Sequence, residues 1–439
     1  MAMKKKLLII RKYVLENKNN KKEIHLSKTK HLDIYIIVFI LAVLATATFF
    51  ILNVFGVFTK VDTYIAIKST VENGVNYDND LSCALHFKGR ENRVNSAKSS
   101  ATKIYTAALK SVHMHVDAEN RYSESASIAD INYFVNEVCT VDDEVYKIVK
   151  EAYELSDVEN NNYSIFAAPL YDEWFKLVSF SKNNDYSLDP VNSEDEKAYI
   201  EQLTAIINNT ENYSLEFLDN NRIKLTISDT YKEFRTNYDI HGPIISLNVL
   251  ENAFKLEAAK KALEENGFTY GYLASTSGLG VTLKGLEKLS HSVYNKDLGY
   301  GEIGYVTLEG EYAFKKTTMF EINESNSYYH YKFNDSEGKT YYRNLSLNLK
   351  TGYPNDYYLS TQIYEKNNDL KKAALDNQRL LMVDSLEKET DYINANQNID
   401  LCLNKTESPN SYLLSKNLQE KIYIFKPEVY TINIINKEE

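Results

Sequence analysis

Apolar residues recur along this chain with two different periods, which predict helices in some segments and strands in others. A spacing of three or four residues, typical of an amphipathic helix, runs from Ala97 to Val116, from Val141 to Asp157 and from Val249 to Gly267. Asp142 or Asp143 is placed to cap the start of the second helix, and Gly267 to end the third. These segments predict three long helices.

Strict alternation of apolar and polar residues predicts strands elsewhere. Residues 215–227, LEFLDNNRIKLTI, predict a β-hairpin that turns at Asp219, Asn220 and Asn221. In residues 344–356, NLSLNLKTGYPND, the part before Thr351 predicts a half-buried strand whose apolar side is formed by three leucines, Leu345, Leu347 and Leu349. A turn follows that strand, because Gly352 permits a positive φ and Pro354 fixes the exit of the chain.

The order of these elements predicts the fold class and the organisation of the chain. Strands over 360–366 and 399–405 flank a helix over 368–383. Hairpins mixed with long helices indicate an α+β fold, in which antiparallel sheets are covered by helices behind one N-terminal transmembrane helix. The expected parts are a basic segment over 1–33, a transmembrane helix over 34–58, a folded domain over 61–403 and a C-terminal extension over 404–439.

The N-terminal apolar segment predicts the cellular location. Ile34 to Phe58 contains no charged residue over a length sufficient to cross a bilayer. Lysines and arginines dominate the segment before it, so the positive-inside rule places the N-terminus in the cytoplasm. A cleaved signal peptide is disfavoured, because the apolar run is too long and no A-x-A site follows it. We therefore expect a single-pass protein of the cell membrane with an extracytoplasmic domain.

Composition narrows the function further. The chain of 439 residues has a formal net charge of −11, which argues against nucleic-acid binding, since that requires clustered cations. The cysteines Cys83, Cys139 and Cys402 show no metal-binding spacing. One disulfide is possible outside the cell, but an odd count leaves a free thiol, and buried structural cysteines are favoured.

Three separated segments, in the same order, resemble one family. The first is a Ser/Asn-rich loop, a helix and a PL-x-x-x-W stretch; the second leads into a helix and Gly267; the third ends in Thr-Gly-Tyr-Pro. These segments are NRYSESASIADINYF (120–134) with VDDEVYKIVKEAYELSD (141–157) and YSIFAAPLYDEW (163–174), ISLNVLENAFKLEAAKKALEENG (245–267), and GKTYYRNLSLNLKTGYP (338–354). Together they resemble the FAD:protein FMN transferases of the ApbE type over roughly residues 61–403.

The resemblance implies a chemistry and a set of cofactors. The family cleaves the pyrophosphate of FAD and transfers FMN to a Thr or Ser of an acceptor protein. Such transfer depends on positioning and on a divalent cation, here Mg²⁺, that neutralises charge. In the family an Asp and a Thr four residues later on a helix hold the metal, together with a backbone carbonyl of a Gly-rich segment.

Residue by residue, the resemblance transfers some positions and loses others. The expected cofactor-binding residues come from three places. Tyr122 and Asn132 match the first loop of the family, and Asn252 stands at the position of the family lysine. Thr351, Gly352 and Tyr353 match the turn. At the metal, Ala374 stands at the Asp position and Gln378 at the Thr position. Glu251 would supply the backbone carbonyl, so Glu251 and Gln378 are the expected metal ligands, with Asp369 or Asp376 as alternative sources of a carboxylate.

Several functional residues of the family are replaced here, and no catalytic residue is assigned. Ser246 replaces the acid of the Gly-rich segment, Leu345 replaces a His, and Asn348 and Leu349 replace Asp-Pro. Trp174 could stack on an isoalloxazine ring, although a lone tryptophan is more often a core residue.

Two functions follow from this pattern. The first is a membrane-anchored, Mg-dependent FMN transferase that uses FAD and modifies a partner protein. The second is a catalytically inactive relative that binds FAD or FMN or serves as a protein-interaction module at the membrane. Asn132 could contact the nucleotide, or it could act as an ordinary turn or cap residue.

Overall fold

The computed structural model describes residues 32–54, 56, 59–72, 74–181, 184–295, 301–320, 330–396 and 398–435. These residues form two compact units. The first comprises residues up to Lys60 together with Arg90–Asn92, and the second comprises Val61–Gly89 and Arg93–Glu439.

The first unit contains the helix α2 (Leu32–Val54). Most of the predicted basic segment, residues 1–31, lies outside the described residues, as do residues 55, 57 and 58 of the apolar segment. Within the described part of the chain, no helix combines the length and the apolarity required to span a membrane.

The remaining helices of the described residues occur mostly in runs between groups of strands. In order they are α3 (Glu91–Val116), α4 (Ile128–Tyr133), α5 (Asp143–Glu154), α6 (Val158–Asn161), η1 (Ile165–Ala167), α7 (Ala168–Phe180), α8 (Glu194–Asn208), η3 (Thr210–Asn212), α9 (Asp229–Asn237), η4 (Asn248–Leu250), α10 (Glu251–Glu265), α12 (Leu370–Leu380), α13 (Leu386–Ala395) and η6 (Lys416–Leu418).

Within the described residues, the strands build one large sheet and four small ones. In order they are β1 (Lys60–Ile67), β2 (Leu81–Arg90), β3 (Val138–Thr140), β4 (Tyr213–Leu218), β5 (Arg222–Ile227), β6 (Gly271–Ser275), β7 (Leu279–Thr282), β8 (Lys288–Asn295), β9 (Gly301–Glu309), β10 (Ala313–Thr318), β11 (His330–Asn334), β12 (Thr340–Asn344), β13 (Leu347–Asn348), β14 (Tyr353–Pro354), β15 (Tyr358–Glu365), β16 (Asp400–Lys405), β17 (Ser411–Ser415), β18 (Ile422–Ile424) and β19 (Thr431–Ile435).

The large sheet has nine strands in the order β1-β2-β6-β7-β10-β15-β16-β17-β19. From β2 to β17 every neighbouring pair is antiparallel, whereas β17 and β19 are parallel. The predicted α+β fold with antiparallel sheets is therefore confirmed.

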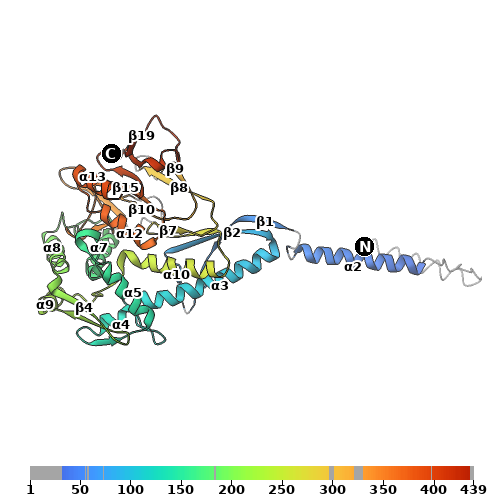
Figure 1. The fold of residues 1–439 in the computed structure, drawn as a ribbon, viewed down its shortest axis with the longest axis horizontal. Coiled ribbons are helices and arrows are strands. Elements are labelled where there is room, and N and C mark those ends of the chain that lie inside the picture. The colour runs from blue at the N-terminus through green and yellow to red at the C-terminus, as the bar shows by residue number, and fades with distance from the viewer. Residues whose placement is uncertain are drawn as a thin grey trace, which may run out of the picture. The chain divides into compact units, whose positions relative to one another are not determined.

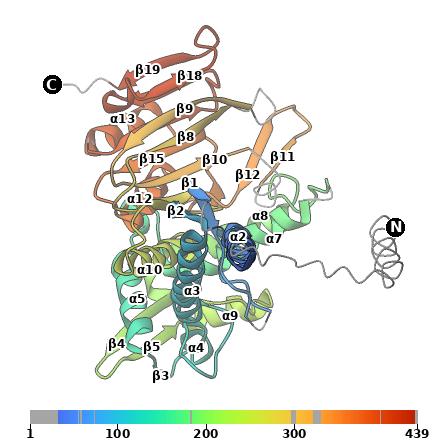
Figure 2. The same ribbon diagram turned by 90° about the vertical axis from the view of Figure 1, so that its right-hand side faces the viewer.

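Helices separate the large sheet from a smaller one. Figures 1 and 2 show α3 and α10 between the nine-stranded sheet and the sheet of β3, β5 and β4, while β8, β9 and β18 form a further sheet on the other side. The main core fills this arrangement with buried side chains from both sheets and the helices between them, including Leu109, Val149, Leu256, Leu273 and Ala374.

Local sequence signals account for most element boundaries. Gly267 adopts φ +82° just after α10, as predicted. Asp142 holds the N-cap position of α5, but its carboxylate makes no capping hydrogen bond and accepts instead from Ser125 and Ala126. The predicted hairpin forms from β4 and β5, with Asn220 and Asn221 at positive φ in its turn. All three cysteines are buried and unpaired, as expected for structural residues.

The strand predicted over residues 344–350 is wrong. The chain forms only the two-residue strands β13 and β14 around the turn. The side-chain oxygens of Asn344 and Asn348 accept hydrogen bonds from the backbone N–H groups of Ser346 and Lys350, two residues on, at 2.7 and 3.0 Å. Such bonds bend the backbone away from an extended strand, so both asparagines are buried instead of facing solvent.

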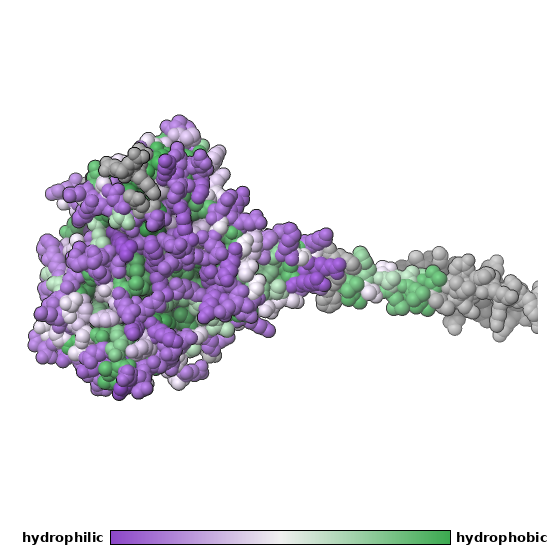
Figure 3. All heavy atoms as spheres, in the orientation of Figure 1, coloured by the Kyte–Doolittle hydropathy of each residue, from purple (hydrophilic) through white to green (hydrophobic). Residues whose placement is uncertain are grey.

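The surface of the second unit is mainly hydrophilic. On the face shown in Figure 3, apolar residues lie in scattered groups among polar ones, whereas α2 has a largely apolar surface. Scattered apolar residues of this kind are normal for a folded domain.

Candidate functional site

Asn132 joins the first predicted segment to the second. Its side-chain oxygen accepts hydrogen bonds from the N–H groups of Ile244 and Ile245 at 3.1 and 3.0 Å. Its side-chain nitrogen donates to the carbonyls of Ala118 and Ile245 at 3.1 and 2.9 Å. The whole hydrogen-bonding capacity of the amide thus holds the backbone together.

Tyr122 lies in the connection after α3 and contacts that helix. Its hydroxyl donates to Asp117 at 2.6 Å and lies 3.4 Å from His113 Nε2. Burial, reinforced by the Asp117 carboxylate, raises the pKa of Tyr122 above its ordinary value.

Glu251 and Asn252 are the first two residues of α10. The Glu251 carboxylate pairs with Lys255 one turn further along the helix. Its carbonyl lies in the first helical turn, where the N–H four residues on is the ordinary partner. Asn252 Nδ2 lies 3.4 Å from Ser277 Oγ, in the turn between β6 and β7.

Lys315 also contacts Ser277, the residue in contact with Asn252. Lys315, on β10, donates a hydrogen bond to the carbonyl of Ser277. No carboxylate in the described part of the chain forms an ion pair with it, and burial lowers the pKa of Lys315 to about 8. A cation therefore lies beside Asn252, the position at which the family resemblance expects a lysine.

The Thr-Gly-Tyr-Pro turn is fixed by buried side chains. The Asn348 carbonyl accepts from the N–H of Gly352 at 2.8 Å and from the hydroxyl of Thr351 at 3.3 Å. Gly352 adopts φ +78°, and its carbonyl accepts from the indole N–H of Trp174 at 2.7 Å. Tyr353 meets Trp174 edge-to-face with ring centroids 6.0 Å apart. Trp174 is fully buried, in agreement with a core role.

Asn162 links this turn to α12. Its side-chain nitrogen donates to the carbonyls of Leu347 and Gln378 at 2.9 and 3.1 Å, and its oxygen accepts from the Leu349 N–H at 2.7 Å. Gln378 is itself buried, and its amide nitrogen donates to the Tyr171 hydroxyl at 3.1 Å. The turn and the predicted metal helix therefore meet through one asparagine.

The carboxylates of α12 are already engaged. Asp376 is fully buried, with one oxygen 2.6 Å from Lys372 Nζ and the other 2.6 Å from Arg379 Nη1. Burial raises the pKa of Asp376, against the effect of Lys372. Asp369 caps the helix by accepting from the Lys372 N–H at 2.9 Å.

These residues do not fit a Mg²⁺ ion, which prefers several free oxygen ligands in octahedral geometry. The side chain of Ala374 has no ligand atom, and both oxygens of the Asp376 carboxylate are paired with cations. Nowhere in the described residues do three His, Cys, Asp or Glu side chains gather as a metal site.

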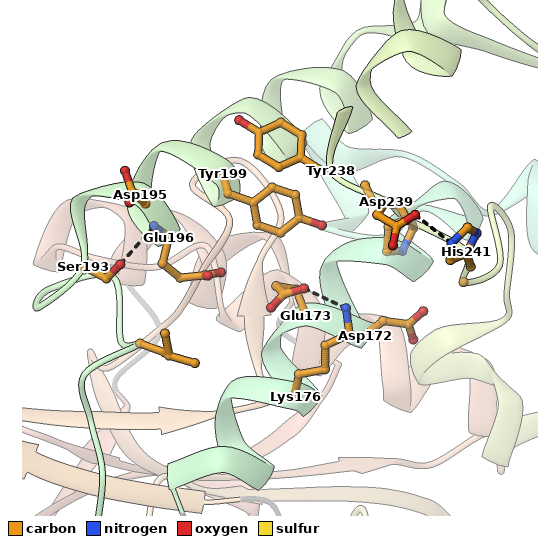
Figure 4. Close-up of a pocket in the computed structure, with 14 residues that line it drawn as sticks. Asp172, Glu173, Lys176, Ser193, Asp195, Glu196, Tyr199, Tyr238, Asp239 and His241 are labelled. Atoms are coloured by element: carbon orange, nitrogen blue, oxygen red, sulfur yellow. Dashed lines mark hydrogen bonds and ion pairs between the residues drawn. The ribbon is translucent and has the colours of Figure 1, made fainter. Parts of the chain in front are cut away.

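A cavity of about 490 Å³ lies between α7, α8 and residues 238–242. Five carboxyl groups line it, two from α7, two from α8 and one from the loop; they are Asp172, Glu173, Asp195, Glu196 and Asp239. Figure 4 shows Glu173 and Glu196 pointing into the space below the Tyr199 ring. No sequence pattern marks this cavity, because its residues come from three segments without a shared motif.

Two of the carboxyl groups that line the cavity have raised pKa values. Burial, followed by the charges of neighbouring carboxylates, raises the pKa of Asp172 to about 6 and that of Glu196 to about 7. Glu173 pairs with Lys176 at 2.9 Å. Perturbed carboxyl groups in a cavity mark a functional-site candidate.

Comparisons with solved structures show the class of fold. The ApbE protein from Thermotoga maritima superimposes with a TM-score of 0.54 at 15% identity, over 82% of this chain and 99% of that one. The flavin transferase ApbE from Vibrio cholerae gives a TM-score of 0.54 at 13% identity, over 82% and 99% of the two chains. The apo form of the Pseudomonas stutzeri flavinyl transferase ApbE gives 0.50 at 12% identity, over 82% and 97%.

The chain therefore has an ApbE-like, flavin-transferase fold with strongly diverged sequence. No family model matches the chain, and no curated protein sequence matches it either.

Proposed function

We propose that this protein binds a flavin nucleotide on an ApbE-like fold without carrying out Mg-dependent FMN transfer. The observation that carries the proposal is that the carboxylates of α12 are already engaged, Asp376 in ion pairs and Asp369 in the helix cap. Where the resemblance expects a metal-binding Asp, the helix has Ala374, and its one nearby buried acid, Asp376, is paired with Lys372 and Arg379. Displacing two cations from a buried carboxylate costs several kcal/mol in general, about 3–5 for a broken buried pair.

Lys315 supports the proposal that the fold binds an anionic ligand. Its ammonium group has no carboxylate partner in the described residues and lies with Asn252 at Ser277. A partly desolvated lysine beside hydroxyl and amide donors suits the phosphates of a nucleotide. A lysine in this position could also neutralise phosphate charge without a metal.

Membrane anchoring is part of the same proposal. The uncharged segment Ile34–Phe58 and the basic residues before it support a single-pass anchor with the second unit on the extracytoplasmic side. Large apolar side chains of α2, among them Phe39, Leu44 and Phe50, are more than half exposed, and a bilayer would cover them.

The test is FAD binding and turnover by the full-length protein in detergent. Equilibrium dialysis should detect bound FAD, and chromatography should detect no AMP in the presence of Mg²⁺. Lys315→Gln should weaken FAD binding about tenfold through loss of a charge-assisted bond. Lys316→Gln is the matched control, because the adjacent residue of a strand faces the opposite side of the sheet.

A second candidate is an active Mg-dependent FMN transferase that modifies a membrane partner, and the flavin-transferase fold favours it. AMP release that a chelator abolishes would establish this candidate and refute the first. Protein that neither binds nor cleaves FAD would leave the fold as a protein-interaction module.

A further inference from the structure

The cavity between α7, α8 and residues 238–242 contains polar groups without protein partners. Tyr199 is only 9% exposed, and its hydroxyl, which solvent reaches, forms no hydrogen bond within the described residues. The Glu196 Oε1 atom is buried and has no partner. Buried polar atoms in folded proteins nearly always have a hydrogen-bond partner. Because both groups face one cavity, they indicate a ligand that supplies hydrogen-bond donors (Figure 4).

The charge of the cavity selects a cation. Five of the residues that line it are acidic, whereas Lys176 is the one lysine or arginine among them. Lys176 extends into solvent, with 68% of its side chain exposed, yet its ammonium group contacts Glu173 at 2.9 Å. The chain itself thus places an alkylammonium group against the largely buried Glu173 carboxylate. Arg235 does not line the cavity, and it donates to the Gly242 carbonyl at 2.8 Å.

The walls favour an organic cation over a metal ion. The described carboxylates do not converge as a group of three metal ligands. Tyr199 and Tyr238 have ring centroids 4.8 Å apart, and Leu188 and Ile240 add apolar surface. Tyrosine faces attract ammonium groups, and apolar walls bury a hydrocarbon chain, whereas a small metal ion would use neither.

We propose that this cavity binds an alkylammonium group, with Glu173 and Glu196 as its carboxylate partners and the Tyr199 hydroxyl as a further acceptor. The group comes from a free linear polyamine or from a lysine side chain of a partner protein. The site is separate from the nucleotide position proposed at Lys315, so either proposal can fail alone.

The experiment is calorimetric titration of the full-length protein in detergent with spermidine. Spermidine should bind, and Glu173→Gln or Glu196→Gln should each weaken binding about tenfold or more, because a charge-assisted hydrogen bond is lost. Tyr199→Phe should weaken binding severalfold while keeping the ring. Glu194→Gln is the matched control: Glu194 is an exposed acid of the same helix that does not line the cavity, and binding should change by less than about twofold.

A second arm identifies the source of the group. A lysine-rich peptide that binds more tightly than spermidine, and competes with it, assigns the site to a partner protein; the reverse order assigns it to a free polyamine. Both orders support the alkylammonium site. Spermidine binding that is absent, or unchanged in both glutamine variants, would overturn it, as would Mg²⁺ binding that depends on the same two glutamates.

Discussion

The turn at Gly352 offers a stability test whose size follows from the structure. At φ +78° an alanine adopts the left-handed conformation at a cost of about 1–2 kcal/mol. Its Cβ would also lie 2.0 Å from Thr204 Oγ1 and 3.3 Å from Ile200 Cγ2, so the Thr204 side chain or α8 itself must shift. Such overpacking costs about 1–3 kcal/mol. Gly352→Ala should therefore lower the free energy of unfolding by about 3 kcal/mol.

Urea denaturation followed by tryptophan fluorescence measures this change. Trp174 is the only tryptophan, and its indole N–H contacts the Gly352 carbonyl, so its emission reports directly on this region. Circular dichroism of the same samples checks that the whole domain unfolds in one step.

Gly338→Ala is the matched control for the backbone cost alone. Gly338 has φ +85° in the β11–β12 turn, but no atom lies within 4 Å of the position of an added Cβ. It should cost only the backbone part, about 1–2 kcal/mol. Equal losses for the two variants would refute the argument that packing against α8 fixes the turn. Thr204→Ala added to Gly352→Ala should recover part of the loss.

Three further predictions rest on other buried groups. Asn132→Ala should lower the free energy of unfolding by about 2–3 kcal/mol in urea denaturation, because backbone groups lose their partners; an unchanged midpoint would refute its joining role. Asp376→Asn should cost about 3–5 kcal/mol by thermal denaturation, since Lys372 and Arg379 lose their carboxylate, and an undiminished melting temperature would contradict the paired state. Burial raises the pKa of Asp172 to about 6 from 3.8, so the folded protein binds this proton more tightly than the unfolded chain, and stability falls as pH rises from about 4 to 6. Asp172→Asn should reduce that fall and stabilise the protein by up to about 2 kcal/mol at pH 7; a pH profile identical to that of the unsubstituted protein would argue against the shift.

Local patterns predicted much of the fold. The amphipathic spacing of α5 and α10 and the paired asparagines of the β4–β5 hairpin depend only on neighbours in sequence, and they formed where expected. The strand expected at residues 344–350 failed because Asn344 and Asn348 bond to backbone two residues on, and hydrophobic alternation does not register that competition. The register of nine strands depends on long-range pairing, which no local pattern encodes.

The candidate site was less predictable. The sequence located the Thr351–Tyr353 turn and its neighbours, but not Asn162 or Lys315, whose roles arise from contacts between distant segments. A signal for Lys315 existed in retrospect, since Lys315 and Lys316 are adjacent lysines on a strand whose other residues are apolar or threonine. The pairing of Asp376 with Lys372 and Arg379 follows helical spacing and could have been anticipated.

Phosphorus NMR of FAD mixed with the full-length protein and Mg²⁺ shows most directly whether the protein binds FAD without cleaving it. We expect the pyrophosphate signals to broaden on binding and then to stay constant, in the presence or absence of EDTA. Replacement of those signals by an AMP signal, prevented by EDTA, would show instead that the fold retains metal-dependent chemistry.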